Sequence, residues 1–487
     1  MPDRRLPLVL PLAGILLATA ACADNGPPAK ADPPTATAGA PSPTPSQPAG
    51  ALVKEGWFGG GNTLHARVAI SGVERQGGRS VLRFSVTSLD GVAKSMAFPV
   101  PLIDPVGRRL YRPTSPNTAQ QFQPNVAREV TAEYPEIPAG VGRVTALTPG
   151  TAGEFTGVPV TGTAARPATG ADADQADQAN PVDLYDITEG EIRDVTSSGS
   201  DVKVNLRADV LFAVDSAELS GRAKAVLDQA AQEIKAKADP AGKPLTIDGH
   251  TDSEGETDAN LELSTERAEA VTKELKARLG GTYRYTTTGK GETRLIAKEG
   301  GADDAQARSR NRRVEISYVV RRQTVGTTSA STAPASGGSG AAAGPAAFRA
   351  QDGKTVASRY GRFGQEKRRL DVKAFYRDGA YIVAVFDLVS EGPGSTPANA
   401  AYPHKDYPGG AFTSFSIVVG KDVYRAVRVG QPAGDATVYV DPGRGTFRGN
   451  QNEPSRAFAY IPAPPGKPTS VVFDGGPFGK VDNVPVQ

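Results

Sequence analysis

Cysteine and histidine are scarce in this chain. Of its 487 residues, one is Cys and three are His, and the three His residues stand far apart, at His65, His250 and His404. A single Cys excludes an intramolecular disulfide, and this His spacing contains none of the ligand patterns of a zinc site. The sequence also offers no Cys or Ser nucleophile in a recognisable motif, which disfavours an enzyme.

An excess of charge of one sign is absent as well. Lys and Arg together number 55 and Asp and Glu number 53, a balance that disfavours nucleic acid as the main partner. Gly and Pro, in contrast, are abundant at 55 and 40 residues, as is typical of turns and linkers. A chain of this length is too long for one ordinary core, so we expect several domains.

The first 22 residues have the features of an export signal. Two Arg residues precede an apolar run over residues 6–17, and small residues follow and end on Cys22. The run is shorter than the roughly 20 apolar residues that a membrane span needs. Small residues directly before a Cys resemble a bacterial lipoprotein box, which implies cleavage after Ala21 and a diacylglyceryl group on Cys22. The alternative is an ordinary secretory signal with an incidental Cys.

Low-complexity stretches divide the rest of the chain. They are rich in Pro, Ala, Thr, Ser or Gly and contain too few large apolar side chains to bury a core. The predicted organisation is a signal peptide (1–21), the lipidated Cys with a Pro/Ala/Thr-rich linker (22–50), a β-rich module (51–161), a linker (162–181), a central domain (182–322), a Ser/Ala/Gly-rich linker (323–346) and a second β-rich module (347–487).

The two outer modules share a series of short motifs. Each has a dense apolar strand, at 81–86 in the first module and at 381–386 in the last. Each later contains Tyr-Arg, Ile-Pro-Ala and Val-Pro-Val, in that order. Short alternating strands with Gly and Pro turns predict antiparallel β-sandwich-like modules. We interpret the two as a diverged duplication, with coincidence as the alternative.

The central segment alternates strands and helices, which predicts a compact α/β sandwich with βαβαββ order. Apolar residues at helical spacing indicate helices at 219–234 and 263–279, the second stopped by Gly280-Gly281. Strands are predicted at 202–206, 210–212, 245–247, 283–287 and 313–320, with a charged loop and a short helix before the last of them.

The most distinctive polar pattern lies on one loop and the helix that follows it. Asp252 stands in the Gly-flanked sequence 249–255, and Asn260, Leu263 and Arg267 follow at helical spacing on one face. A carboxylate can hold an ammonium group, and a guanidinium can grip a carboxylate with two parallel hydrogen bonds. The pair Asp252 and Arg267 therefore suits a zwitterion, such as the free backbone end of an amino acid.

Each of the residues at or near this site also has an interpretation that involves no ligand. The alternative for Asp252 and Arg267 is a salt bridge with no ligand. His250 lies beside the site and is interpreted as a structural, hydrogen-bonded loop residue, because it has no paired nucleophile. Arg312 and Arg313 alternate along a predicted strand, so at most one of them points to the site.

The central segment resembles the OmpA-like C-terminal domain, the peptidoglycan-associated fold shared with Pal lipoproteins and MotB stators. The matching motifs lie at 209–217, 249–252, 260–271 and 308–316, in the family's order and spacing. They cover under a third of the chain. Two positions depart from the family pattern: Ala307 replaces the usual Gly, and Val214 replaces the usual Phe or Tyr.

This resemblance implies non-covalent binding of the diaminopimelate in peptidoglycan stem peptides. Asp252 and Arg267 are then the principal ligands, and the pocket is lined by Asp215, Thr251, Asn260, Leu263 and Arg312. No catalytic residue, cofactor or metal is implied. Lysine-type stems lack the second carboxylate, so Arg267 would lose its partner there.

The sequence therefore predicts a lipid-anchored protein on the extracytoplasmic face of a membrane, which links that membrane to the cell wall. The alternative is an envelope scaffold or receptor whose β-modules bind another exported protein, with wall binding only for positioning. An enzyme such as a wall hydrolase is the third possibility, and the absent motifs disfavour it.

Overall fold

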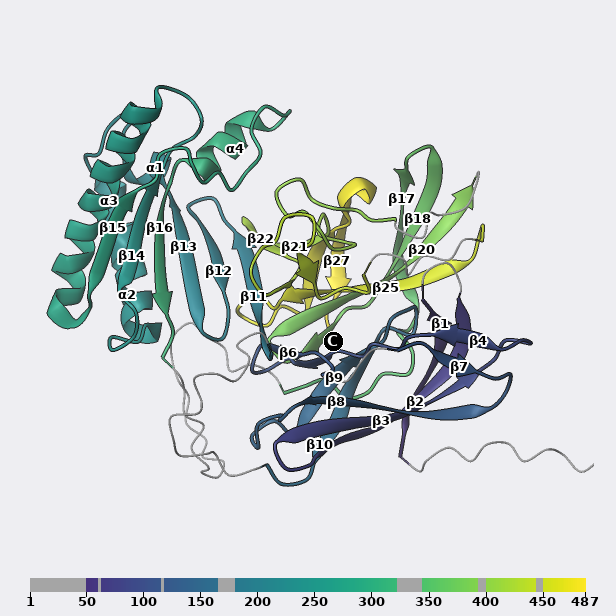
Figure 1. Ribbon diagram of the computed structural model, residues 1–487. Coiled ribbons are helices and arrows are strands. Elements are labelled where there is room, and N and C mark those ends of the chain that lie inside the picture. The colour runs from purple at the N-terminus through teal and green to yellow at the C-terminus, as the bar shows by residue number, and fades with distance from the viewer. Residues whose placement is uncertain are drawn as a thin grey trace, which may run out of the picture. The chain divides into compact units, whose positions relative to one another are not determined.

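The computed structural model describes residues 50–59, 63–114, 118–164, 180–321, 344–392, 400–443 and 450–487. All of them belong to one compact unit, Gln47–Gln487 (Figure 1). The predicted signal peptide, Cys22 and most of the three predicted linkers lie outside the described residues. None of the helices in the described part of the chain has the length and apolar character needed to span a membrane.

The first module contains two sets of four antiparallel strands. The first set runs β1 (Leu52–Phe58), β2 (Leu64–Arg75), β3 (Arg79–Ser88) and β8 (Ala127–Pro135). The second runs β6 (Arg109–Tyr111), β5 (Leu102–Asp104), β9 (Arg143–Leu147) and β10 (Glu154–Thr161). A small pair is formed by β4 (Lys94–Met96) and β7 (Gln120–Phe122). Both large sets contribute to one core, and β10 also pairs with β2 in parallel.

The last module repeats this strand order. Its first set runs β17 (Thr355–Phe363), β18 (Glu366–Lys373), β20 (Tyr381–Gly392) and β25 (Pro454–Pro462). Its second set runs β22 (Asp422–Arg425), β21 (Ser416–Val419), β26 (Ser470–Asp474) and β27 (Lys480–Pro485). Further short strands are β19 (Tyr376–Asp378), β23 (Arg428–Val429) and β24 (Val438–Tyr439). The predicted antiparallel β-character of both modules is confirmed, and the matching strand order supports the duplication.

The central domain is an α/β layer structure. Its strands follow the order β11 (Val182–Glu189), β12 (Arg193–Ser197), β13 (Asp201–Arg207), β16 (Arg313–Val319), β14 (Leu245–His250) and β15 (Tyr285–Gly289), and only the β14–β15 pair is parallel. Its helices are α1 (Ala208–Leu211), α2 (Gly221–Lys237), α3 (Thr257–Leu279) and α4 (Asp304–Asn311). Both α2 and α3 pack on the sheet and bury one apolar core (Figure 1). From β13 onward the predicted α/β order is confirmed, whereas β11 and β12 were not predicted.

One predicted strand of this domain is wrong. Residues 210–212 belong to the helical turn α1 and its C-cap, which places Leu211 and Phe212 in the core. A three-residue apolar run fits a strand and a helical turn equally well, so periodicity alone cannot separate them.

Strand β11 is shared by all three modules. It pairs with β12 in the central domain, with β6 of the first module through Val182 opposite Leu110, and with β22 and β23 of the last. Leu184 on this strand is fully buried among apolar side chains from both outer modules. The predicted boundary at residue 182 therefore falls at the start of a strand that joins the modules to one another.

Candidate functional site

The polar loop singled out by the sequence connects β14 to α3. Two glycines let α3 approach the strands closely: a Cβ on Gly249 would lie 1.9 Å from the Ser264 carbonyl oxygen, and one on Gly289 would lie 2.1 Å from the Thr265 hydroxyl. Gly255 adopts a φ of +94°, which favours glycine. The loop therefore lies at the carboxyl end of β14, directly before α3.

Asp252 is nearly buried, with 7% of its surface exposed. Its Oδ2 accepts a hydrogen bond from Nη1 of Arg312 at 2.5 Å, and its Oδ1 accepts one from the Glu254 N–H at 3.3 Å. Arg312 also donates to both carboxylate oxygens of Asp209, each at 2.8 Å. Hydrogen bonds to Asp209 and Asp252 raise the pKa of Arg312, so its positive charge is fixed beside both carboxylates.

Arg267 is buried too, with 5% of its surface exposed. Its Nε donates to the Ser216 carbonyl oxygen at 2.9 Å, and its guanidinium carbon lies 5.4 Å from the centre of the Phe212 ring. Burial lowers the pKa of Arg267, while the charges of Asp209, Asp215 and Asp252 oppose this shift. Within the described ranges its terminal nitrogens donate no hydrogen bond, and no ion pair joins it to Asp252. The alternative of a structural Asp252–Arg267 salt bridge is therefore not what these residues form.

The other predicted pocket residues have different surroundings. Asn260 donates to the Glu254 carbonyl oxygen at 2.9 Å and to Oε2 of Glu292 at 2.5 Å, so it braces the loop from α3. The Thr251 hydroxyl is buried and has no hydrogen-bond partner among the described residues. Leu263 is half-buried, and Asp215 is exposed with a φ of +51°. Asp215 contributes to the site through its charge on Arg267.

Of the residues beside the site, Arg312 and Arg313 point in different directions as predicted, whereas His250 lacks the predicted hydrogen bond among the described residues. Arg312 reaches Asp252, whereas Arg313 is buried and donates to the Asn205 side-chain oxygen at 3.2 Å, so the prediction that at most one points to the site is confirmed. His250 is buried, but neither ring nitrogen has a hydrogen-bond partner in the described segments. Burial, with a smaller effect of Arg313, lowers the pKa of His250 to about 3, so the ring is neutral.

Three acidic residues of the site were missed by the sequence reasoning. Asp209 lies in the motif 209–217 but is not among the predicted pocket residues, and both it and Asp252 accept hydrogen bonds from Arg312. Glu299 accepts hydrogen bonds from the Ser253 hydroxyl and N–H at 2.5 and 3.3 Å, and Glu292 holds Asn260. Glu292 and Glu299 come from the charged loop between β15 and α4, where no spacing pattern marks them.

Comparison with known proteins finds a family for the central domain. Residues 211–312 match the model of the OmpA family. Outer membrane protein A of Bordetella avium is 36% identical over 121 residues, which are 25% of this chain and 59% of that protein. The peptidoglycan-associated lipoprotein of Pseudomonas putida is 31% identical over 105 residues, which are 22% of this chain and 59% of that protein. The crystal structure of the peptidoglycan-associated lipoprotein from Burkholderia pseudomallei is similar at 27% identity, covers 23% of this chain and 86% of that chain, and has a TM-score of 0.18.

The chain therefore carries an OmpA-like domain, and the resemblance noted in the sequence is confirmed for this part of it. The chain spans less than two thirds of the length of these two curated relatives. The family match covers the loop between β14 and α3, together with α3 and α4, and it leaves the two β-modules outside.

Proposed function

We propose that this protein binds peptidoglycan non-covalently, with Asp252 and Arg267 gripping the zwitterionic end of diaminopimelate. The observation that supports this most is the state of Arg267. It is a buried guanidinium that lies in the field of three carboxylates, and its terminal nitrogens are not used by the described residues. A buried cation in that state is suited to a ligand carboxylate.

The ligand's ammonium group has a matching acceptor. Asp252 pairs with Arg312, which fixes the orientation of its carboxylate. Among the described residues, its Oδ1 then accepts only one long hydrogen bond, from Glu254. The ligand carboxylate then lies against Arg267 and the ammonium against Asp252. A lysine-type stem would leave Arg267 unmatched, at a cost of about 1–3 kcal/mol.

The remaining parts complete a membrane-to-wall link. A diacylglyceryl group on Cys22 would anchor the exported chain on the extracytoplasmic face, because two acyl chains hold a membrane stably. Tethering raises the local concentration of both partners, so a weak site is sufficient. The β-modules serve as spacers or docking surfaces. No catalytic step is assigned to this protein.

A peptidoglycan co-sedimentation experiment tests this proposal. The full chain is compared as wild type, Asp252→Ala, Arg267→Ala and the exposed control Arg222→Ala. Wild type and the control should sediment with diaminopimelate-type wall, and both site variants should stay in solution with unchanged circular dichroism. Lysine-type wall should retain less of the wild type. Equal sedimentation of all four proteins would contradict the proposal.

The alternative function is an envelope scaffold or receptor, in which the β-modules bind another exported protein and wall binding only positions it. In that case the site variants would lose the wall but still capture the partner through the β-modules.

A further inference from the structure

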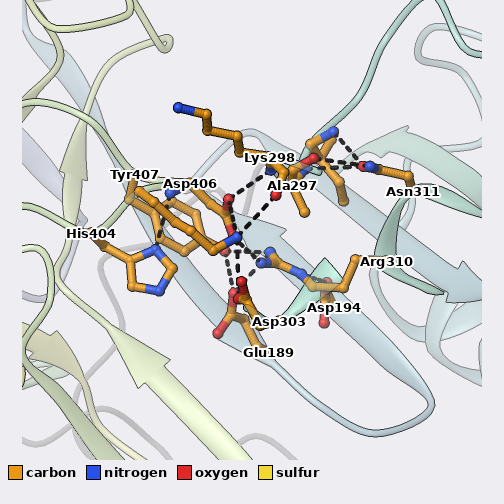
Figure 2. A network of polar contacts seen from close by, with 12 residues as sticks. Glu189, Asp194, Ala297, Lys298, Asp303, Arg310, Asn311, His404, Asp406 and Tyr407 are labelled. Atoms are coloured by element: carbon orange, nitrogen blue, oxygen red, sulfur yellow. Dashed lines mark hydrogen bonds and ion pairs between the residues drawn. The ribbon is translucent and has the colours of Figure 1, made fainter. Parts of the chain in front are cut away.

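A buried charge network joins α4 of the OmpA-like domain to the loop before β21 of the last module (Figure 2). Arg310 on α4 is 6% exposed. Its Nη1 pairs with Asp406 at 2.8 Å, and its Nη2 pairs with Glu189 at 2.8 Å. Its Nε donates to Asp194 at 3.2 Å. The Arg310 guanidinium is thus held by residues from both the central domain and the last module.

Within this network the charge of Glu189 is compensated by two guanidinium groups. Burial opposes ionisation of Glu189, but the guanidinium groups of Arg425 and Arg310 outweigh it and lower the pKa of Glu189 to about 2. Tyr407 donates from its hydroxyl to Glu189 at 2.7 Å and accepts from Arg310 at 2.8 Å. Removing one partner from such a buried set leaves an uncompensated charge, so the contact has a defined geometry.

A first chain of hydrogen bonds leads from this contact to the ligand loop, which is the segment 251–256 between β14 and α3. Oδ1 of Asp406 accepts from the Lys298 N–H at 2.9 Å (Figure 2). Lys298 directly precedes Glu299, whose carboxylate accepts from the Ser253 hydroxyl at 2.5 Å. Ser253 directly follows Asp252. Asp406 therefore fixes the main chain beside the residue that holds the ligand loop.

A second chain reaches Asp252 from the other side. Asn311, between Arg310 and Arg312, is fully buried and donates to Glu299 at 2.6 Å and to the Ala297 carbonyl oxygen at 2.9 Å. Arg312 then pairs with Asp252 at 2.5 Å. Asp406 thus binds Lys298 and Arg310, which lie one and two residues from Glu299 and Arg312, respectively. Glu299 and Arg312 are the residues that hold the loop around Asp252.

From this arrangement we infer that the last β-module positions the wall-binding pocket, with Asp406 as the positioning residue. The inference rests on the proposed function for its binding consequence. A site binds well only if the residues that support its ligands are themselves fixed, because a loop that must be ordered on binding lowers affinity. The β-module thereby acts on the affinity through Asp406, which makes no contact with Asp252 or Arg267 in the described part of the chain.

The experiment uses the full chain with Asp406→Ala and Asp406→Asn. The matched control is Lys421→Gln, which removes an ion pair between the same two modules: Lys421 and Glu191 lie 2.5 Å apart, but both are exposed and far in sequence from the pocket. Two quantities are measured: hydrogen exchange of a peptide covering residues 249–256, and retention on diaminopimelate-type wall.

Asp406→Ala should speed exchange in the 249–256 peptide and weaken wall retention about 2- to 30-fold, the range for couplings of this kind. Asp406→Asn keeps an oxygen acceptor for the Lys298 N–H, so it should restore part of the slow exchange. Lys421→Gln should change neither quantity.

The results separate the two proposals. Exchange that stays at the wild-type rate in both Asp406 variants, or that rises as much in Lys421→Gln, overturns the positioning role while leaving the proposed function intact. If the wild type does not bind the wall, the proposed function fails, and the exchange measurement still decides whether Asp406 positions the loop. Should Asp406→Ala not fold, the Asp406→Asn variant decides, through its exchange and its retention.

Discussion

At the scale of single residues, Arg312 provides the positive charge that stabilises the nearly buried carboxylate of Asp252. It pairs with Asp252 and Asp209 together, and Asp252 is nearly buried. The sequence placed Arg312 in the pocket by resemblance, and the structure gives it a direct partner there.

Replacing Arg312 with Gln should therefore destabilise the fold. The change leaves a nearly buried carboxylate without its cation, and we expect a loss of about 1–3 kcal/mol in the free energy of unfolding. Urea unfolding of Arg312→Gln, Asp252→Asn and the double variant would measure it. The double variant should lose less free energy of unfolding than the two single variants lose together. Strictly additive losses would show that the pair is not coupled.

His250 should make stability depend on pH. In the folded state its pKa is lowered to about 3 from 6.5, so the unfolded chain takes up a proton below about pH 6.5 while the folded chain stays neutral. This contribution to stability is fully present above pH 6.5 and declines as pH falls towards 3, by up to about 1.4 kcal/mol per pH unit. His404, with its pKa lowered to about 4 chiefly by burial, adds an effect of the same sign.

The measurement is urea unfolding at pH 7.5 and pH 5 for wild type and His250→Gln. The variant has no proton to take up at this position, so its stability should fall less between the two pH values. If both proteins lose the same free energy of unfolding between pH 7.5 and pH 5, His250 does not have the lowered pKa that its burial implies.

At the scale of elements, the long helices were predictable and the shortest elements were not. Apolar spacing and Gly280 marked α3, which the structure ends at Leu279 with Gly280 at a φ of +67°. For residues 210–212 the sequence predicts a strand where the structure has a helical turn, because three residues are too few to show a period. The loop between β14 and α3 was recognisable from Gly249 and Asp252, whereas Glu299 lies in a loop whose path no local pattern predicts.

The close contact of α3 with the strands gives an element-scale prediction. Gly289→Ala would place a Cβ 2.1 Å from the Thr265 hydroxyl and 2.7 Å from the Thr265 backbone nitrogen, so α3 would have to shift. We expect a loss of about 1–3 kcal/mol, as for overpacking elsewhere, and a lower Tm. Gly221→Ala on α2, where the Cβ meets nothing within 4 Å, is the control and should leave the Tm equal or slightly higher. A Tm for Gly289→Ala equal to that of the control would contradict the close packing.

At the scale of the whole molecule, the three modules are joined by β11. The strand pairs with all of them, and the apolar cluster around Leu184 draws side chains from both β-modules. Contacts between the modules could not be predicted from the sequence, because no local pattern relates residues such as Arg310 and Asp406, which lie 96 residues apart.

This joining predicts cooperative unfolding. Calorimetry of the full chain should show one main thermal transition, since separating any module exposes part of the cluster around Leu184 and unpairs β11. Deleting residues 347–487 should accordingly expose apolar surface that binds a hydrophobic dye. Well-separated transitions, or a truncated protein that binds no dye, would show that the modules fold independently.

The burial of the Arg310 network also decides how this molecule responds to ionic strength. Salt screens exposed charges over about 10 Å at 0.1 M but acts much less on buried pairs. The side chains of Arg310, Asp406 and Glu189 are 7%, 3% and 11% exposed, whereas those of the Lys421–Glu191 pair are 76% and 58% exposed. Concentrated salt would therefore loosen the outer ion pair and leave the inner contact in place. The contact between the central domain and the last module is thus expected to persist from low salt to high salt.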